Sequence, residues 1–228
     1  SQGVPVAYYD KTSDYDVQRR ANVLAGIAAA IDNDQLSLAY QPIINLHERR
    51  CYKCEALVRW HHPEQGVIEA ASFMSIIEAT QMILKIARIV IKAAIKDAKM
   101  WQQQGQEMTV SVNLSARNLM DDELVDFLVG ETQRQSLDPS FIQLEITETM
   151  LMADRYAAER ALNQLVKAGF SIALDDFGTG YSSLAYLPGF PINSLKIDSS
   201  FTTKMLTDKG TKSVVESTVE LSRKLGLF

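Results

Sequence analysis

SIALDDFGTGYSSL, residues 171–184, combines an apolar run, two neighbouring aspartates and a glycine-rich turn. The apolar run predicts a buried strand that ends at Asp175 and Asp176. Adjacent carboxylates repel each other and are costly to bury unless a cation lies beside them. The pair therefore either caps the turn that follows, a common use of aspartate, or helps to bind a metal ion.

Apolar strands followed by helices recur along the chain in both directions from this stretch. Strands are predicted over residues 108–115, 141–147, 170–176 and 194–198, and helices over 72–104, 121–135, 153–168, 182–188 and 208–225. Repeated strand–helix units are typical of a parallel sheet covered by helices. We expect an α/β fold, with a TIM-like (β/α) barrel as the first choice and an open doubly wound sheet as the alternative.

The N-terminal part departs from this order. Residues 1–14 are polar and irregular and predict a linker-like segment, whereas residues 15–228 are expected to form one domain. A helix is predicted over 14–32, followed by strands over 35–44 and 51–60. Because only a few residues join these two strands, an antiparallel hairpin is expected.

Composition limits the possible partners. The chain has 228 residues, 46% hydrophobic and 22% charged, with a formal net charge of −5. This size fits one large domain with a sizeable core. The negative charge argues against a broad surface for duplex DNA or RNA, although local cations can still hold a small anion. No apolar run is long enough to span a bilayer, so no membrane contact by this domain is expected.

Polar side chains lie at or near the ends of successive predicted strands. They are Glu55, Asn113, Glu145, Asp175, Asp176 and Lys196. In a barrel, the carboxyl ends of the strands meet at one face, where catalytic groups usually lie. Oxygen ligands suit Mg²⁺ or Mn²⁺ better than zinc, and so many carboxylates favour two ions. Two ions can stabilise the attacking and leaving oxygens of a phosphoryl displacement, while purely structural carboxylates are the alternative.

The glycine-rich turn fits a ligand site beside these residues. Gly178 and Gly180 permit backbone conformations that other residues avoid, so the loop over 177–183 can bend closely around a ligand. We expect this loop to act as a lid or gate.

Two further motifs favour structural interpretations. Cys51 and Cys54 form a lone CxxC, which could be a redox motif or half a zinc site, but reduced thiols are favoured because no second pair exists. His61 and His62 are candidate metal ligands. Local hydrogen bonding and strand termination by Pro63 are favoured instead.

The motifs YQPI (40–43), EALVRW (55–60), VNLSARNL (112–119), LEITE (144–148), DDFGTGYSSL (175–184) and LKID (195–198) occur in this order. In identity, order and spacing they resemble the EAL-domain family of bacterial phosphodiesterases, which hydrolyse cyclic di-GMP to the linear dinucleotide pGpG. The resemblance runs from about residue 20 to the end of the chain. It implies a TIM-like barrel whose first strand is antiparallel, in keeping with the expected hairpin.

The resemblance also implies a metal site. The first ion would be held by Glu55, Asn113, Glu145 and Asp175, and the second would be reached by Asp175 and Asp176. The expected cofactors are accordingly two Mg²⁺ or Mn²⁺ ions.

Four other residues match functional positions of the family. Lys196 would assist the nucleophilic water, together with the catalytic carboxylates, and Glu148 would steady the glycine-containing loop. Gln41 and Arg59 would contact the substrate, and a guanidinium fork matches a pair of phosphate oxygens.

The implied function is that of a cyclic-di-GMP-specific phosphodiesterase, with a non-catalytic cyclic-di-GMP receptor as the alternative. The family resemblance further implies a homodimer and a GGDEF or sensory domain upstream. It also implies a cytoplasmic location, whether or not the parent protein has a membrane anchor.

One departure concerns the C-terminal end. Family members continue past the segment LSRKLGL (221–227) into strands with AEGVE-type and QGY-type motifs, whereas this sequence ends at Phe228. We therefore expect the natural protein to continue. If it does not, an open barrel edge would be exposed, and a swapped or otherwise paired dimer would be expected to cover it.

Overall fold

The computed structural model describes residues 11–179 and 187–228. Within these ranges one seven-stranded sheet has the order β1-β2-β4-β5-β6-β7, with β3 beside β2. The strands are β1 (Leu36–Asn45), β2 (Arg50–His62), β3 (Gly66–Glu69), β4 (Thr109–Asn113), β5 (Ile142–Thr147), β6 (Ser171–Phe177) and β7 (Ser194–Ile197). Strands β1 and β3 are antiparallel to β2, and the pairs from β2 through β7 are parallel.

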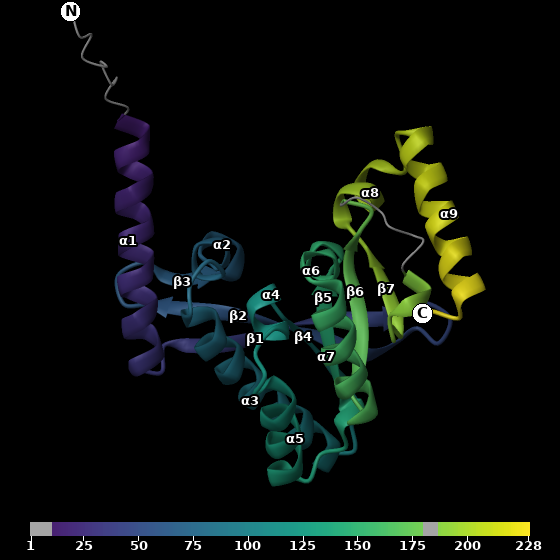
Figure 1. Ribbon diagram of the computed structural model, residues 1–228, viewed down its shortest axis with the longest axis horizontal. Coiled ribbons are helices and arrows are strands. Elements are labelled where there is room, and N and C mark those ends of the chain that lie inside the picture. The colour runs from purple at the N-terminus through teal and green to yellow at the C-terminus, as the bar shows by residue number, and fades with distance from the viewer. Residues whose placement is uncertain (1–10, 180–186) are drawn as a thin grey trace, which may run out of the picture.

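Helices connect the strands and flank the sheet, with α1 at one end of the molecule and α9 at the other (Figure 1). They are α1 (Lys11–Asp32), α2 (Met74–Ile77), α3 (Met82–Gln103), α4 (Ala116–Leu119), α5 (Leu124–Gln135), α6 (Glu148–Ala153), α7 (Arg155–Lys167), α8 (Ser199–Lys204) and α9 (Lys209–Leu225). Single 3-10 turns lie at Ala70–Ser72, Pro139–Phe141 and Leu187–Gly189. None of the described helices is long and apolar enough to cross a membrane.

The two faces of the sheet differ in chemistry. On β2, the side chains of Cys54, Ala56, Val58 and Trp60 are buried in the apolar core with residues of α1 and α3, whereas the alternate positions are only partly buried. A doubly wound sheet needs an apolar surface and a covering of helices on both faces. The second face of β2 carries Lys53, Glu55 and Arg59, so it lacks the apolar surface that helices on that side would need.

The hairpin predicted at the start of the sheet is confirmed. Strands β1 and β2 pair antiparallel, with Gln41 opposite Glu55, and Arg49 takes a left-handed conformation in the turn. Strand β3 was not predicted from the sequence. It follows a tight turn in which Gly66 has φ +74°, a conformation that favours glycine.

The helix predicted over 72–104 is interrupted. Helix α2 ends at Ile77 and α3 begins at Met82. The side chain of Thr80 hydrogen-bonds to a backbone group at each of these two helix ends. Its hydroxyl donates to the Ile77 carbonyl (2.8 Å) and accepts from the Met82 backbone N–H (3.2 Å). A side chain that satisfies free backbone groups in this way competes with helix continuation.

Other boundaries also differ from the prediction. Helix α1 already begins at Lys11, so residues 11–14 of the predicted linker are helical, and residues 1–10 lie outside the described residues. The helix predicted over 121–135 begins at Leu124. Helix α6 precedes α7. Asp154 is the N-cap residue of α7, and its side chain accepts a hydrogen bond from the Ala157 backbone N–H (3.1 Å). Helix α8 was not predicted. The helix expected over 182–188 falls mostly outside the described residues.

The last residue of the chain lies along the edge of β7. The Phe228 backbone N–H donates to the Asn193 carbonyl (3.1 Å), and the Leu195 N–H donates to the Phe228 carbonyl (2.8 Å). These two bonds flank Asn193–Leu195 in the pattern of a parallel ladder. Helix α9 thus returns the backbone to the sheet next to β7.

Candidate active site

Four parallel strands bring their polar residues together around the ammonium of Lys196. Its Nζ donates to Asp175 Oδ2 (2.8 Å), to Glu55 Oε2 (3.1 Å) and to Glu145 Oε2. The lysine comes from β7 and the carboxylates from β2, β5 and β6. Residues that are far apart in sequence therefore meet in one place, as predicted.

Asn113, the last residue of β4, completes this group. Its amide Nδ2 donates to Glu55 Oε1 (2.7 Å). One potential ligand oxygen from each of Glu55, Glu145 and Asp175 lies within 4.8 Å of the other two. We call Glu55, Asn113, Glu145, Asp175 and Lys196 the acidic cluster.

Burial and charge act in opposite directions on the pKa values in the cluster. Burial raises the pKa of Glu145, Lys196 opposes this, and Glu55 and Asp175 raise it further. Burial alone would lower the pKa of Lys196, but Glu145 and Asp175 outweigh it and raise this pKa. The lysine is therefore a firmly protonated counter-charge for its carboxylate neighbours.

The donor set of the cluster fits a hard divalent cation. The Glu145 side chain is fully buried, yet its Oε1 atom has no hydrogen-bond partner among the described residues. A buried carboxylate oxygen without a donor is costly, and a bound cation would satisfy it. Carboxylate oxygens of Glu55 and Asp175 lie nearby, and Asn113 could add an amide oxygen, all of them ligands that Mg²⁺ and Mn²⁺ prefer. The described residues thus form a site that can bind a metal ion.

Asp176 lies next to this group rather than inside it. It has φ +53°, and its backbone N–H donates to Asp175 Oδ1 (2.9 Å). Burial, then Asp175 and Asp198, raise the pKa of Asp176. Asp198 is thus a close charged neighbour of Asp176, and its side chain caps α8 by accepting from the Ser200 backbone N–H (2.9 Å). Sequence reasoning gave Asp198 no role, although it lies in the quoted motif LKID.

The two predicted substrate-binding residues flank the cluster on the hairpin. Gln41 is exposed and lies directly opposite Glu55 in the β1–β2 register, which places both side chains on one face. Arg59 is four residues beyond Glu55 on the same face of β2. Its guanidinium donates to the Val58 carbonyl (3.2 Å) and lies 3.9 Å from Glu69. Their contact with a substrate stays a prediction.

Glu148 and the glycine-rich turn lie beyond the strand ends. Glu148 is buried at the first position of α6, directly after β5. Gly178 has φ +98°, and a Cβ atom there would come within 3.1 Å of the Phe201 ring, so the position requires glycine. Gly180 and most of the predicted lid lie outside the described residues, so its gating role stays a prediction.

The favoured interpretations of the cysteines and histidines are confirmed. Both cysteines are free thiols, and burial raises the pKa of Cys54 to about 11, which disfavours a reactive thiolate. His61 Nε2 lies 2.6 Å from the Ser37 hydroxyl. Strand β2 ends at His62, whose Nδ1 accepts from the backbone N–H groups of Glu64 and Gln65 (3.1 and 3.2 Å) in the turn that follows.

A hollow of about 490 Å³ adjoins the acidic cluster. Asn113, Asp175 and Asp176 line one side, and apolar residues of β2 and α3 line the other. Met74 and Glu78, on and just after α2, border it as well. A polar end beside an apolar wall is a common arrangement for binding a ligand with both phosphate and aromatic groups.

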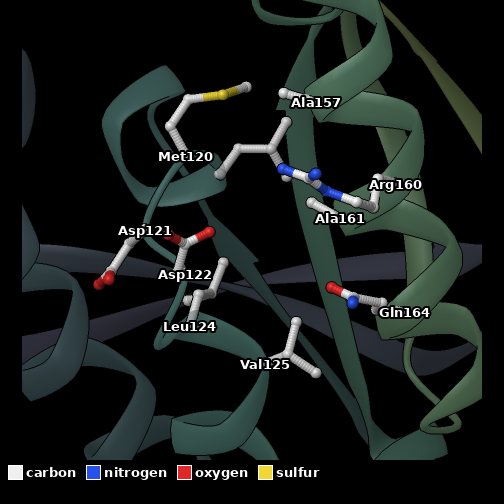
Figure 2. A pocket seen from close by; sticks show the side chains of 10 residues that line it. Met120, Asp121, Asp122, Leu124, Val125, Ala157, Arg160, Ala161 and Gln164 are labelled. Carbon is white, nitrogen blue, oxygen red and sulfur yellow. The ribbon is translucent and has the colours of Figure 1, made fainter.

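A second pocket, of about 460 Å³, lies between α5 and α7. Figure 2 shows Arg160 extending from α7 into this pocket, toward the turn that carries Asp121 and Asp122. It contains no member of the acidic cluster. We therefore place the candidate active site at the strand ends and not in this pocket.

The fold and the cluster together define an α/β-barrel protein with an oxygen-ligand site at the carboxyl ends of its strands. The model of the EAL domain family matches residues 25–227. The chain belongs to the EAL domain family. The TIM-like barrel with an antiparallel first strand is thereby confirmed, and the doubly wound alternative is wrong.

Named relatives agree with this assignment. MucR of Pseudomonas aeruginosa, a bifunctional diguanylate cyclase/cyclic di-GMP phosphodiesterase, is 35% identical over 221 residues, 96% of this chain and 32% of that protein. The cyclic di-GMP phosphodiesterase PA2567 of the same organism is 32% identical over 226 residues, 99% of this chain and 38% of that protein. The chain thus spans about a third of the length of these relatives.

One solved structure is similar to this protein over most of the length of both chains. The PaMucR phosphodiesterase in complex with c-di-GMP superimposes with a TM-score of 0.87 at 37% identity, over 90% of this chain and 84% of that one.

Proposed function

We propose that this protein hydrolyses cyclic di-GMP to linear pGpG with the help of two Mg²⁺ or Mn²⁺ ions. The observation that carries the proposal is the acidic cluster within a chain of the EAL domain family, in which no described residue donates to the buried Glu145 Oε1. The similarity to MucR and to its c-di-GMP complex supports the choice of substrate.

The proposed ligands of the first ion are Glu55, Asn113, Glu145 and Asp175, and those of the second are Asp175 and Asp176. Bound ions would supply Lewis-acid stabilisation of the attacking and leaving oxygens of the phosphodiester. Burial raises the pKa of Asp176, and a cation bound beside this carboxyl group would favour its charged form.

The remaining residues bind and orient the reactants. A bound ion that takes one carboxylate from Lys196 would free an N–H of its ammonium, which then holds the attacking water by a hydrogen bond. Gln41 and Arg59 contact the phosphate groups from the β1–β2 hairpin. The water oxygen attacks phosphorus, the P–O3′ bond breaks, and the water proton passes to the leaving 3′ oxygen. Glu148 steadies the glycine-containing loop, since it is buried next to the strand that carries Glu145.

Replacing Glu55 by glutamine tests the proposal. Glu55→Gln keeps the size and the acceptor for Asn113 but removes a ligand charge, so hydrolysis of cyclic di-GMP with Mn²⁺ should fall at least about a hundredfold. Glu107→Gln makes the same change at an exposed position outside the cluster and should leave the rate unaltered. Tight binding of cyclic di-GMP without cleavage by the unsubstituted protein would instead establish the non-catalytic receptor.

We extend the proposal to the setting of the domain. It works in the cytoplasm, as a homodimer, downstream of a GGDEF or sensory domain, and the description of MucR as a diguanylate cyclase as well as a phosphodiesterase supports such a pairing. The molar mass of the full-length protein in solution, measured by light scattering, tests the dimer. A monomer at micromolar concentration would contradict it.

A further inference from the structure

A second polar layer lies beneath the acidic cluster. It consists of Lys53, Ser111, Gln143 and Ser194, which we call the lower layer. Each of them precedes, by two positions on the same strand, a member of the acidic cluster. Side chains two apart on a strand project from the same face, so the lower layer supports the cluster from inside the barrel.

The amide of Gln143 connects all four members of the lower layer. Its Oε1 accepts from Lys53 Nζ (2.7 Å) and from the Ser111 hydroxyl (3.2 Å). Its Nε2 donates to the Ser194 hydroxyl (3.1 Å). An ammonium can only donate, so the oxygen of the amide must face Lys53 and the nitrogen must face Ser194.

These hydrogen bonds constrain the distances between strands that are not adjacent in the sheet. Backbone hydrogen bonds between neighbouring strands do not set those distances. Strand β5 is separated from β2 by β4, and from β7 by β6. The bonds from Gln143 to Lys53 and to Ser194 therefore cross the interior and skip one strand on each side. Gln143 is only 4% exposed, and an amide buried to this extent is destabilising when it is left unpaired. The amide is thus held in one orientation by its partners.

We propose that Gln143 is a positioning residue for the metal site. Its amide holds β2 and β7 at fixed distances from β5, and so holds Glu55 and Lys196 at fixed distances from Glu145. This inference rests on the metal binding proposed above. It predicts that loss of the amide spreads the ligand oxygens and weakens metal binding, even though Gln143 touches no metal ligand by a hydrogen bond found among the described residues.

The test is the substitution Gln143→Met, which keeps the side-chain size and the net charge but removes all three hydrogen bonds. Titration with Mn²⁺, followed by the electron paramagnetic resonance signal of the free ion, measures affinity without reference to activity. Residues that support metal ligands typically contribute 10- to 100-fold to affinity, so the Kd should rise about tenfold. Ser194→Ala, which removes only the link to β7 and hardly changes volume, should raise it about threefold.

A matched control separates positioning from a general loss of stability. Leu144→Val alters the next residue of β5, which is fully buried on the opposite face, and removes a buried methylene group from the core without touching the lower layer. Its Kd for Mn²⁺ should stay within about twofold of the original.

The outcomes distinguish the two proposals. If the unsubstituted protein binds no Mn²⁺, the proposed metal dependence is wrong, and the positioning role with it. If it binds Mn²⁺ and the folded Gln143→Met variant binds equally well, only the positioning role is wrong. The same holds if Leu144→Val weakens binding as much as Gln143→Met. Should Gln143→Met fail to fold, an unchanged Kd in Ser194→Ala overturns the proposal.

Discussion

At the scale of single residues, Lys196 explains how three carboxylates can share one partly buried site. Each of Glu55, Glu145 and Asp175 accepts a hydrogen bond from its ammonium. The sequence argument assigned the compensation of the adjacent aspartates to metal ions alone. In the structure the lysine already compensates part of this charge, but one ammonium among three carboxylates leaves the site formally negative before any ion binds. A cation that enters must therefore compete with the ammonium for the same oxygens.

Lys196→Met is expected to destabilise the protein by about 2 kcal/mol, less than for a fully buried pair because the ammonium is partly exposed. The loss leaves carboxylates that repel one another, and Mn²⁺ should relieve that repulsion. The rise in Tm caused by Mn²⁺ should consequently be larger in this variant than in the original protein, as thermal unfolding with and without the ion would measure.

The control for this prediction is Lys224→Met. It removes an ammonium that pairs with Glu220 (2.7 Å) on the surface of α9, so stability should hardly change. Equal Tm shifts with Mn²⁺ in Lys196→Met and in the original protein would contradict the competition between ammonium and cation.

At the scale of elements, helix α1 packs closely against strand β2 at Gly26. The ring of Trp60 on β2 lies so close to Gly26 of α1 that an added Cβ would sit 2.5 Å from its Cη2 atom. Ordinary contacts between carbons are near 3.5–4.0 Å, so the helix can approach the strand only at a residue without a side chain. The helix itself would prefer alanine at this position.

Gly26→Ala should therefore destabilise the protein by about 1–3 kcal/mol, because the clash outweighs the gain in helix propensity. Gly130→Ala in α5 is the matched control, since nothing lies within 4 Å of an added Cβ there. That variant should be neutral or more stable by up to about 1 kcal/mol. Chemical denaturation of both variants measures the difference, and equal effects would show that the α1–β2 contact is looser than described.

The same scale shows what the sequence can and cannot predict. Strands, the hairpin and the acidic strand ends follow from local patterns: apolar runs, a short connection, and carboxylates directly after a buried segment. The break at Thr80 does not, because the helical pattern of apolar residues continues through it. Gln143 could not be predicted either. Its partners lie on strands that only the folded barrel brings together, although a glutamine inside an apolar strand was a signal that could have been weighed.

At the scale of the whole molecule, the apolar core and the acidic cluster occupy different parts of the fold. The core lies between the sheet and α1, α3, α5 and α7, and its largest fully buried side chains include Ile27, Ile91, Leu128 and Leu162. The cluster lies at the strand ends on the other face, with Lys196 as its own counter-charge. We therefore expect folding not to depend on a metal ion, in contrast to domains that a structural metal holds together.

Removal of divalent ions tests this separation of stability from the site. After chelation the protein should keep its far-UV circular dichroism and unfold in one cooperative transition. An ion that binds only the folded state at 100 times its Kd adds about 2.7 kcal/mol, so Mn²⁺ should then raise Tm by about 5–10 °C for a chain of this size. Mg²⁺ and Mn²⁺ should act alike, since both prefer oxygen ligands. Loss of the folded state on chelation would mean that the ion also holds the strands together, and Lys196 alone would then be insufficient to stabilise the cluster.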